Sequence, residues 1–470
     1  MSIIGTVRKN LSRLSKHFTV EALCGDGADR FIDEALKHTG RDQQRESPLQ
    51  PKLMMWLTIC LSIFRHESIP AVLARLLTGL RDFVGSLPLR PIDDDALAHA
   101  RKRLGVDPVR EFFRRHASRI IPPATFHGLC VYALDGTLLT MPDTKENRRI
   151  FGRLKTSRGR AAFPQLKMVA LQDVHSHRFR DVTFRRWKTP ERTMALPLLH
   201  HLGDGDLVLM DRGFYAAWFF TALRSQRTHF LARVPAFVKF HPIPGMNKKS
   251  GDYLAWIEAC TSLPLPEKVQ GPHGRPRTHQ RIGMLVRVIH YHVRGFKPVR
   301  LVTSLLDREI PAMELALKYH DRWEIELALD ELKTHQSGTA QGALKTIFRS
   351  HRPRNVMQEA FALVAAYNLI RGAMSQAATR HHIDPKLLSF VDCMRAIEHM
   401  LPRMRTAATL RLRELHDQLL LDLVRSLIDR PRRHRRYARV VKVKMSNFKL
   451  KRPHHREKAF DIRERIRIGA

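Results

Sequence analysis

The 470 residues of the chain are enough for two or three domains, and a hydrophobic fraction of 43% with a charged fraction of 27% excludes a disordered or membrane-embedded protein. Against 45 Asp and Glu stand 82 Lys and Arg, a formal net charge of +37, which indicates a polyanionic partner. The longest apolar run, residues 53–64, falls short of the ~20 residues that cross a bilayer. Because the N-terminus also has no secretion signal, we expect a cytoplasmic protein.

Neither the cysteines nor the histidines form a metal-binding pattern. The 5 cysteines are scattered singly, which favours free thiols over zinc sites or disulfides. The 26 histidines include close pairs, but none has carboxylate or cysteine partners at a metal-ligand spacing, so we expect most of them on the surface or in basic patches. The pairs are His175 and His177, His200 and His201, His381 and His382, and His454 and His455.

Residues 1–125 are expected to form a helical domain. Apolar residues recur at helical spacing in three stretches, 53–65, 69–80 and 95–113. The sequence AHARKRLGVDPVREFFRRHASR places basic residues in both halves of a helix-turn-helix pattern. Such residues suit contacts to DNA phosphates, and on spacing alone they suit a solvated helix surface equally well. The residues proposed to hold DNA are Arg101, Arg103, Arg114 and Arg115.

Residues 126–375 change to an α/β pattern. Three strands are predicted from LCVYALDGTLLTM, LKMVALQDVHS and FRDVTFRRW, and they would pair as an antiparallel meander. A helix, a buried strand, a second helix and a further strand follow, so the order is βββ-α-β-α-β. These four elements are predicted at 193–202, 206–214, 216–225 and 229–234.

An inserted segment separates this pattern from the next helix. Residues 236–296 are rich in turn residues and contain the alternating strand RIGMLVRVIHYHVRG, which predicts a mainly β insertion. The strand PVRLVTSLL and a long helix over 311–336 resume the α/β pattern, and an apolar helix over 357–374 closes it. Residues 376–470 are expected to be helical and to end in a basic tail.

Two aspartates follow predicted apolar strands. Asp135 stands in LDGT after the run 131–134, and Asp211 stands in MDRGF after LVLM. Two-metal phosphoryl-transfer enzymes need carboxylates held close together on rigid elements, and strand ends supply that rigidity. Gly136 and Gly213 follow the two aspartates and leave room for a close approach. Taken alone, an aspartate at a strand end is more often a helix cap.

The helix over 311–336 offers the third carboxylate. In YHDRWEIELALDELK, Tyr319, Arg322, Glu326 and Lys333 stand at offsets 0, 3, 7 and 14, which places them on one helix face. A carboxylate flanked by two cations and a phenol suits a site for metal and phosphate. Ion pairs on an ordinary amphipathic helix would explain the same pattern. Asp330 also lies on this face and is the competing carboxylate, whereas Glu324 and Glu331 point roughly the opposite way.

The ungapped pattern Tyr-x2-Arg-x3-Glu-x6-Lys resembles the signature of bacterial insertion-sequence DDE transposases of the YREK group, the insertion-sequence-four-like family. LDGT and LMDRGF fit the same order of motifs. The resemblance implies a ribonuclease-H-like catalytic core, flanked by helical N- and C-terminal regions, which suits the βββ-α-β-α-β order. It implies two divalent ions, Mg2+ or Mn2+, at Asp135, Asp211 and Glu326, with DNA contacts from Tyr319, Arg322 and Lys333.

The resemblance further implies a transposase that binds the terminal inverted repeats of its element, acts as a homodimer on paired DNA ends and inserts them into target DNA. As a DNA-binding protein of the bacterial cytoplasm it would associate with the nucleoid. Trp256 in the insertion is a candidate platform for a flipped base, although a core or surface tryptophan is the more common case. Two alternatives stay open: a nuclease of the same fold without strand transfer, and a non-catalytic repressor derived from a transposase.

Overall fold

The computed structural model contains two compact units, each assembled from separate stretches of the chain. The first unit comprises Met1–Pro123, Asp135–Leu198 and Glu324–Leu427, and the second comprises Ala124–Leu134, Leu199–Trp323 and Ile428–Ala470. The structure describes residues 28–42, 49–84, 93–156, 159–270, 276–293, 297–337, 346–405, 409–428 and 462–469.

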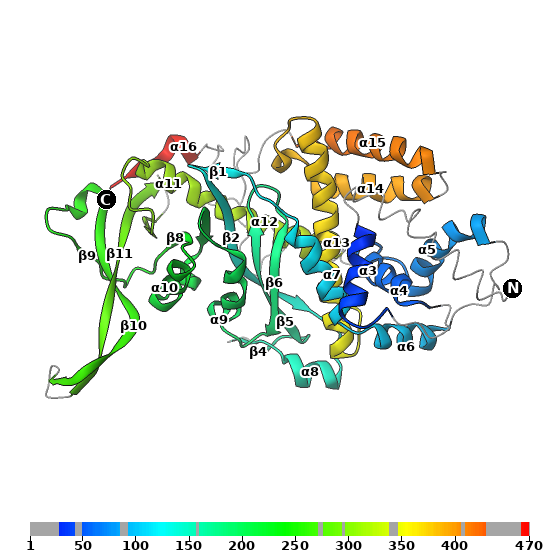
Figure 1. Cartoon of the computed structure of the whole chain (residues 1–470), viewed down its shortest axis with the longest axis horizontal. Coiled ribbons are helices and arrows are strands. Elements are labelled where there is room, and N and C mark those ends of the chain that lie inside the picture. The colour runs from blue at the N-terminus through cyan, green and yellow to red at the C-terminus, as the bar shows by residue number, and fades with distance from the viewer. Residues whose placement is uncertain are drawn as a thin grey trace. The chain divides into compact units, whose positions relative to one another are not determined.

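The N-terminal part of the first unit is helical, as predicted (Figure 1). Every residue from Leu53 to Cys60 is buried, so the longest apolar run forms an interior helix. Gly105 joins the two halves of the predicted helix-turn-helix with a φ of 77°, a conformation that favours glycine. The helices are α3 (Ala28–His38), α4 (Pro51–Cys60), α5 (Ile69–Val84), α6 (Asp94–Leu104) and α7 (Asp107–Ser118).

The predicted meander is confirmed. Strand β2 (Leu129–Thr140) pairs with β5 (Gln165–Asp173), which is antiparallel to β6 (Phe179–Arg186). The connection from β2 to β5 contains the helix α8 (Lys145–Phe151) and a hairpin of two short strands. Neither element was predicted. These elements are too short to show a period in the sequence. The hairpin consists of β3 (Lys155–Thr156) and β4 (Gly159–Arg160).

A second group of helices completes the first unit. The predicted helix over 357–374 is confirmed within the longer α13 (Pro353–Arg380), most of whose residues are buried. Helices α4 and α7 both pack against α13. Further helices follow at α14 (Phe390–Arg405) and α15 (Thr409–Arg425). The basic tail over residues 431–458 lies outside the described residues.

Arg101 is part of this interior rather than of a DNA-binding surface. It lies in α6, is only 4% exposed, and its Nη2 lies 3.3 Å from Oε1 of Glu359 in α13. Its Nε donates to Oε1 of Gln358 at 3.1 Å. The prediction that Arg101 contacts DNA is therefore wrong, because its side chain is buried and bonded to residues more than 200 positions away in the chain. Arg103, two residues further along, is exposed.

Arg114 and Arg115 are also engaged within the first unit. Nη2 of Arg114 lies 3.3 Å from Oδ2 of the buried Asp181. Nε of Arg115 lies 2.7 Å from Oε1 of Glu111, one turn earlier on α7. Arg115 is thus paired along its own helix and Arg114 with a residue of β6.

The second unit is built on the first half of β2. This half is parallel to β7 (Asp206–Met210), which is parallel to β8 (His229–Arg233), while the short β1 (Ala124–Phe126) pairs with β2. Helix α10 (Ala217–Ser225) connects β7 to β8. The predicted helix over 193–202 is α-helical only in α9 (Glu191–Ala195) and continues as the 3-10 helix η1 (Leu196–His201). The order βββ-α-β-α-β is thus confirmed.

The β-rich insertion is also confirmed. Strands β10 (Asp252–Gln270) and β11 (Pro276–Val293) form a long antiparallel ribbon (Figure 1). Strand β12 (Val299–Thr303) joins β11 to β8, and β9 (His241–Pro242) pairs with β10. Residues 376–470 were expected to be helical, but β13 (Ile466–Ile468), which follows the one-turn α16 (Ile462–Arg465), is a strand and pairs with β11.

The helix predicted over 311–336 is a continuous helical run whose pitch changes along its length. A 3-10 turn separates its two α-helical parts, and the last six residues form a π-helix. The turns of the run are α11 (Ala312–Tyr319), η5 (His320–Arg322), α12 (Trp323–Asp330) and the π-helical η6 (Glu331–Gln336). Turns of π-helix are rare and often occur at functional sites.

Among the described residues, no helix is both long enough and apolar enough to cross a membrane.

We predict that Arg101→Ala lowers the free energy of unfolding by about 3–5 kcal/mol, because it leaves the buried Glu359 carboxylate without its cation. The matched control is Arg103→Ala on the same helix, which should change the free energy by less than about 0.5 kcal/mol because Arg103 is exposed. Denaturant unfolding followed by circular dichroism measures both. Equal stability of the two variants would contradict a structural role for Arg101.

Candidate active site

Asp135 lies within β2, at the point where the strand ceases to be buried. Residues 131–134 before it are buried, and Asp135 is half-buried. Its Oδ1 accepts the backbone N–H of Gly136 at 2.7 Å, which orients the carboxylate against its own strand. The rigid placement expected of a strand carboxylate is therefore present.

Asp211 directly follows β7 and caps the 3-10 turn η2 (Arg212–Phe214). Its Oδ1 accepts the backbone N–H of Gly213 at 2.7 Å. A Cβ on residue 213 would lie 2.9 Å from that oxygen, so glycine is required for the close approach. The cap that a strand-end aspartate usually forms is observed, and it holds the half-buried carboxylate in one orientation.

Asp135 and Asp211 occupy equivalent positions in sequence, each directly after the last residue of its strand that pairs with the other strand. Strands β2 and β7 are parallel, and the last paired residues of their ladder are Leu134 and Met210. Asp135 and Asp211 are the next residues of the two strands. The apolar runs therefore end at the same rung of the sheet.

In the first unit, the helical run approaches the same strand. Lys333, in the π-helical turn, donates from Nζ to Oγ1 of Thr137 at 3.4 Å, and Thr137 is two residues beyond Asp135 in β2. Glu326 lies two helical turns before Lys333 and is half-buried, as is Lys333. The segment that contains Glu326 and Lys333 thus packs beside the strand that contains Asp135.

In the second unit, Tyr319 has both Asp211 and Arg322 as electrostatic neighbours. Burial raises the pKa of Tyr319 to about 12; the Arg322 guanidinium opposes this rise, and the Asp211 carboxylate adds to it. Tyr319 and Arg322 are 5% and 6% exposed, and the guanidinium of Arg322 lies 5.0 Å from the ring centroid of Trp323. The phenol therefore keeps its proton at neutral pH and can donate a hydrogen bond.

The other acidic residues of the helical run differ in environment from Glu326. Glu324 and Glu331 are buried, which confirms that they point away from the half-buried face of Glu326 and Lys333. Asp330 is 52% exposed, and its Oδ1 accepts the hydroxyl of Thr334 at 2.8 Å. Glu326 is half-buried and Asp330 is exposed. The choice of Glu326 over Asp330 as the third carboxylate stays a prediction.

Sequence reasoning missed a further carboxylate beside Asp135. Glu191, in the first turn of α9, lies so close to Gly136 that a Cβ on residue 136 would be 2.7 Å from its Oε1. Its Oε1 also lies 3.8 Å from Nζ of Lys167 on β5. Gly136 thus makes room for a side chain rather than for backbone. No sequence pattern relates Glu191 to LDGT, because the two meet only through the meander.

His177 is an exception to the expectation that most of the histidines lie on the surface or in basic patches. It is 3% exposed, its Nε2 lies 2.9 Å from Oε2 of Glu324, and its Nδ1 lies 2.9 Å from Nη2 of Arg371. Its partners are more than a hundred residues away in the chain, so a local spacing rule could not find them. Trp256 in the insertion is 46% exposed, so it is a surface rather than a core tryptophan.

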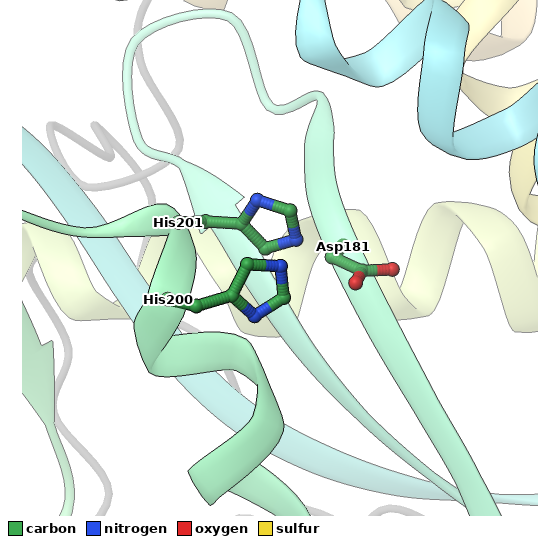
Figure 2. A group of neighbouring side chains, drawn as sticks. All are labelled: Asp181, His200 and His201. Atoms are coloured by element: carbon green, nitrogen blue, oxygen red, sulfur yellow. The ribbon is translucent and has the colours of Figure 1, made fainter.

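A second set of side chains that could bind metal is drawn in Figure 2. His200 and His201 end η1 with their rings 3.8 Å apart between centroids; His200 is exposed, as predicted. Figure 2 also labels Asp181 of β6, which is buried and paired with Arg114. Asp181 belongs to the first unit and the two histidines belong to the second.

Comparisons with known proteins point to one family. Residues 126–369 match the family described as "Transposase DDE domain", and residues 17–114 match "Insertion element 4 transposase N-terminal". The transposase InsG for insertion sequence element IS4 of Escherichia coli (strain K12) is 30% identical over 432 residues, which cover 89% of this chain and 91% of that protein.

Two further proteins are similar. The putative transposase InsZ of the same organism is 27% identical over 192 residues, which are 40% of this chain and 61% of that protein. A cryo-EM structure of a piggyBac transposase synaptic complex with hairpin DNA is 13% identical, with a TM-score of 0.43 and coverage of 86% of this chain and 84% of that one.

The family match spans more than half of the chain and includes all six predicted site residues. The central sheet with helices around it is the mixed α/β arrangement of a ribonuclease-H-like DDE core. The chain therefore belongs to the insertion-element-4 family of DDE transposases, DNA-binding polynucleotidyl transferases that depend on divalent metal ions.

Proposed function

We propose that Asp135, Asp211 and Glu326 are the metal ligands of this transposase and that they hold two Mg2+ or Mn2+ ions. The observation that carries the proposal is the register of the parallel pair β2 and β7, whose last rung, Leu134 with Met210, directly precedes both aspartates. The contact between Lys333 and Thr137 supports the placement of Glu326, because it brings the helical run to the strand of Asp135.

The chemistry of these side chains suits the proposed ions. Carboxylate oxygens are the ligands that Mg2+ and Mn2+ prefer, and a site without sulfur or imidazole ligands disfavours softer metals. Asp135 and Asp211 each direct Oδ1 to a backbone N–H one or two residues further on, so the chain orients both carboxylates before any ion binds. A preorganised ligand set lowers the entropic cost of binding.

The cationic and phenolic residues would position DNA. Arg322 offers a planar guanidinium for a phosphate, and Lys333 offers a compact charge beside β2. Tyr319 stays protonated because burial raises its pKa, so it can donate a hydrogen bond to the DNA end or pack against it. These three residues would hold the end without carrying sequence specificity.

The reaction has two phosphoryl-transfer steps at one site. When bound, the two ions would activate the attacking oxygen and stabilise the leaving oxygen of an in-line displacement. In the first step, a water oxygen attacks phosphorus at the element end and the bond from phosphorus to O3′ breaks, which frees a 3′-hydroxyl. In the second step, that hydroxyl attacks a phosphodiester of target DNA and releases a target 3′-hydroxyl. Arg322 and Lys333 would hold the phosphates in line.

The wider organisation follows from the same proposal. Residues 1–125 would bind the terminal inverted repeats, residues 126–375 with the insertion at 236–296 would catalyse, and residues 376–470 would add a helical region with a basic tail. Two copies would act together on paired ends in the cytoplasm, associated with the nucleoid. Metal-dependent nicking would exclude a repressor, and joining of the cut end to a second duplex would exclude a simple nuclease.

We predict that Glu326→Gln lowers cleavage at the element end by orders of magnitude while end binding persists, because it removes a ligand charge and keeps the size of the side chain. Lys333→Ala removes a phosphate contact instead, so it should weaken placement of the end and leave residual cleavage. Single-turnover cleavage and gel-shift binding separate the two defects.

Asp330→Asn is the matched control for Glu326→Gln, because it removes a neighbouring charge from an exposed position. Normal cleavage by Glu326→Gln together with failure of Asp330→Asn would move the third ligand by one helical turn. Normal cleavage by both variants would require the whole three-carboxylate assignment to be abandoned.

A further prediction concerns the net charge of +37. Affinity for duplex DNA should fall steeply between low and physiological salt, because each neutralised phosphate releases counterions. A fluorescence-anisotropy titration at several salt concentrations measures the slope. A slope near zero would mean that the basic charge serves another purpose.

The end-binding role of the N-terminal helices is best tested with point variants. Helices α4 and α7 pack against α13, so deletion of residues 1–120 would remove part of the core as well as the DNA contacts. We predict that Lys102→Ala with Arg103→Ala, both exposed in α6, weakens end binding and lowers its salt slope by up to ~2. An unchanged slope would place end recognition on other residues.

A further inference from the structure

Two buried carboxylates flank Glu326 on its helical run. Glu324 stands two residues before it and Glu331 five residues after it, and they are 7% and 5% exposed. A buried carboxylate is tolerated only when cations or hydrogen-bond donors compensate for the lost water. Three of their partners, His177, Tyr367 and Arg371, lie in the first unit. The two carboxylates are therefore part of the packing of the Glu326 segment and not of the DNA-facing chemistry.

Arg371 of α13 compensates for Glu331. Its guanidinium forms an ion pair with Oε2 of Glu331 and donates from Nε to the hydroxyl of Tyr367 at 3.2 Å. That hydroxyl in turn donates to Oε2 of Glu331 at 2.8 Å. Burial is the largest influence on the pKa of Glu331 and raises it, but the charge of Arg371 and the hydrogen bonds from Arg371 and Tyr367 together bring the pKa below its ordinary value. Glu331 thus remains charged and fixed to α13.

His177 connects this ion pair to Glu324. Because Arg371 can only donate, Nδ1 of His177 must accept its hydrogen bond at 2.9 Å. The proton of the neutral ring then lies on Nε2, which donates to Oε2 of Glu324 at 2.9 Å. Burial, followed by the charge of Arg371, lowers the pKa of His177 to about 3, in agreement with a neutral ring.

The turn that contains His177 is held in an unusual conformation. His177 has a φ of 63°, which is uncommon for a residue other than glycine and usually persists only where the surroundings impose it. Asp173 accepts the backbone N–H groups of His175 and Ser176 at 3.0 Å each, which closes the turn. Asn368 of α13 forms two hydrogen bonds of 2.8 Å with the backbone of Phe179. The His177 ring therefore projects from a turn that is closed by hydrogen bonds and connected to α13 through Asn368.

These contacts restrain rotation of the helical run about its axis. Glu324 and Glu331 are seven residues apart, close to two turns, and they are held from the turn between β5 and β6 and from α13 respectively. On its other face the run is held by Lys333 on Thr137. A rotation that moved Glu326 would break at least one buried hydrogen bond to a charged group, and such hydrogen bonds are stronger than those between neutral groups.

We propose that His177 and Arg371 are positioning residues for the transposition reaction: they hold Glu324 and Glu331, and through them they fix the orientation of Glu326 toward its metal ion. This inference rests on the proposed role of Glu326 as a metal ligand. Groups that orient a ligand from behind typically change metal affinity or activity by 10–100-fold when they are removed.

The test uses two variants of the full chain. Arg371→Lys keeps the charge but loses the fork that serves Glu331, Tyr367 and His177 together. His177→Asn keeps an acceptor for Arg371 and a residue type that tolerates positive φ, but it loses the donor to Glu324. Mn2+ binding is measured by electron paramagnetic resonance titration, alongside end cleavage and the thermal midpoint. We expect the half-saturating Mn2+ concentration to rise about tenfold in each variant.

Arg101→Lys is the matched control. Arg101 of α6 also forms a buried ion pair with a residue of α13, Glu359, but this pair does not involve the Glu326 segment. It should lower the thermal midpoint to a similar extent as Arg371→Lys and leave Mn2+ binding within twofold of the wild type. If all three variants weaken Mn2+ binding equally, the effect is general destabilisation and the positioning role is refuted. If Arg371→Lys does not fold, His177→Asn decides the question on its own.

Glu326→Gln separates this inference from the proposal beneath it. If Glu326→Gln loses Mn2+ binding while Arg371→Lys and His177→Asn bind like the wild type, only the positioning role is wrong. If Glu326→Gln itself binds Mn2+ like the wild type, the ligand assignment fails and the inference fails with it.

Discussion

The parallel pairing of β2 with β7 is the constraint on which the rest of the site depends. Five consecutive residue pairs, from Cys130 with Asp206 to Leu134 with Met210, set the register, and apolar side chains occupy four of the pairs. A slip by one residue would turn every side chain of a strand to the other face of the sheet. The burial of Val131 to Leu134 and of Leu207 to Met210 therefore determines where the two aspartates emerge.

The helical run between Ala312 and Gln336 contains two kinds of charged residue: those proposed to take part in the reaction, and buried carboxylates that pack against the rest of the first unit. The unit changes just after the 3-10 turn of the run. Tyr319 and Arg322 belong to the second unit, and Glu326 and Lys333 belong to the first. The carboxylates at 324 and 331 face the interior, where Arg371 and His177 compensate for them. Acidic residues are thus used to fasten the segment as well as to serve the proposed chemistry.

The sequence predicted most of the elements with strong local periods, including the meander, the buried strand before Asp211 and the long helical run. It failed where partners are far apart in the chain. Arg101 and Glu359 are 258 residues apart, and His177 and Glu324 are 147 apart, so local spacing in the sequence could not show that Arg101 and His177 are buried. The proposed ligands came from a motif, and their roles remain predictions until the variants are measured.

Because the chain passes between the two units close to the proposed ligands, exchange of one whole unit by recombination would separate those ligands. Two of the points where the chain passes from one unit to the other, after Leu134 and after Trp323, fall within three residues of a proposed ligand, so each unit contains only part of the proposed carboxylate set. Neither unit could be copied into another gene as a working nuclease. Recombination that exchanged whole domains would yield inactive products, which favours transmission of the coding sequence as one uninterrupted block.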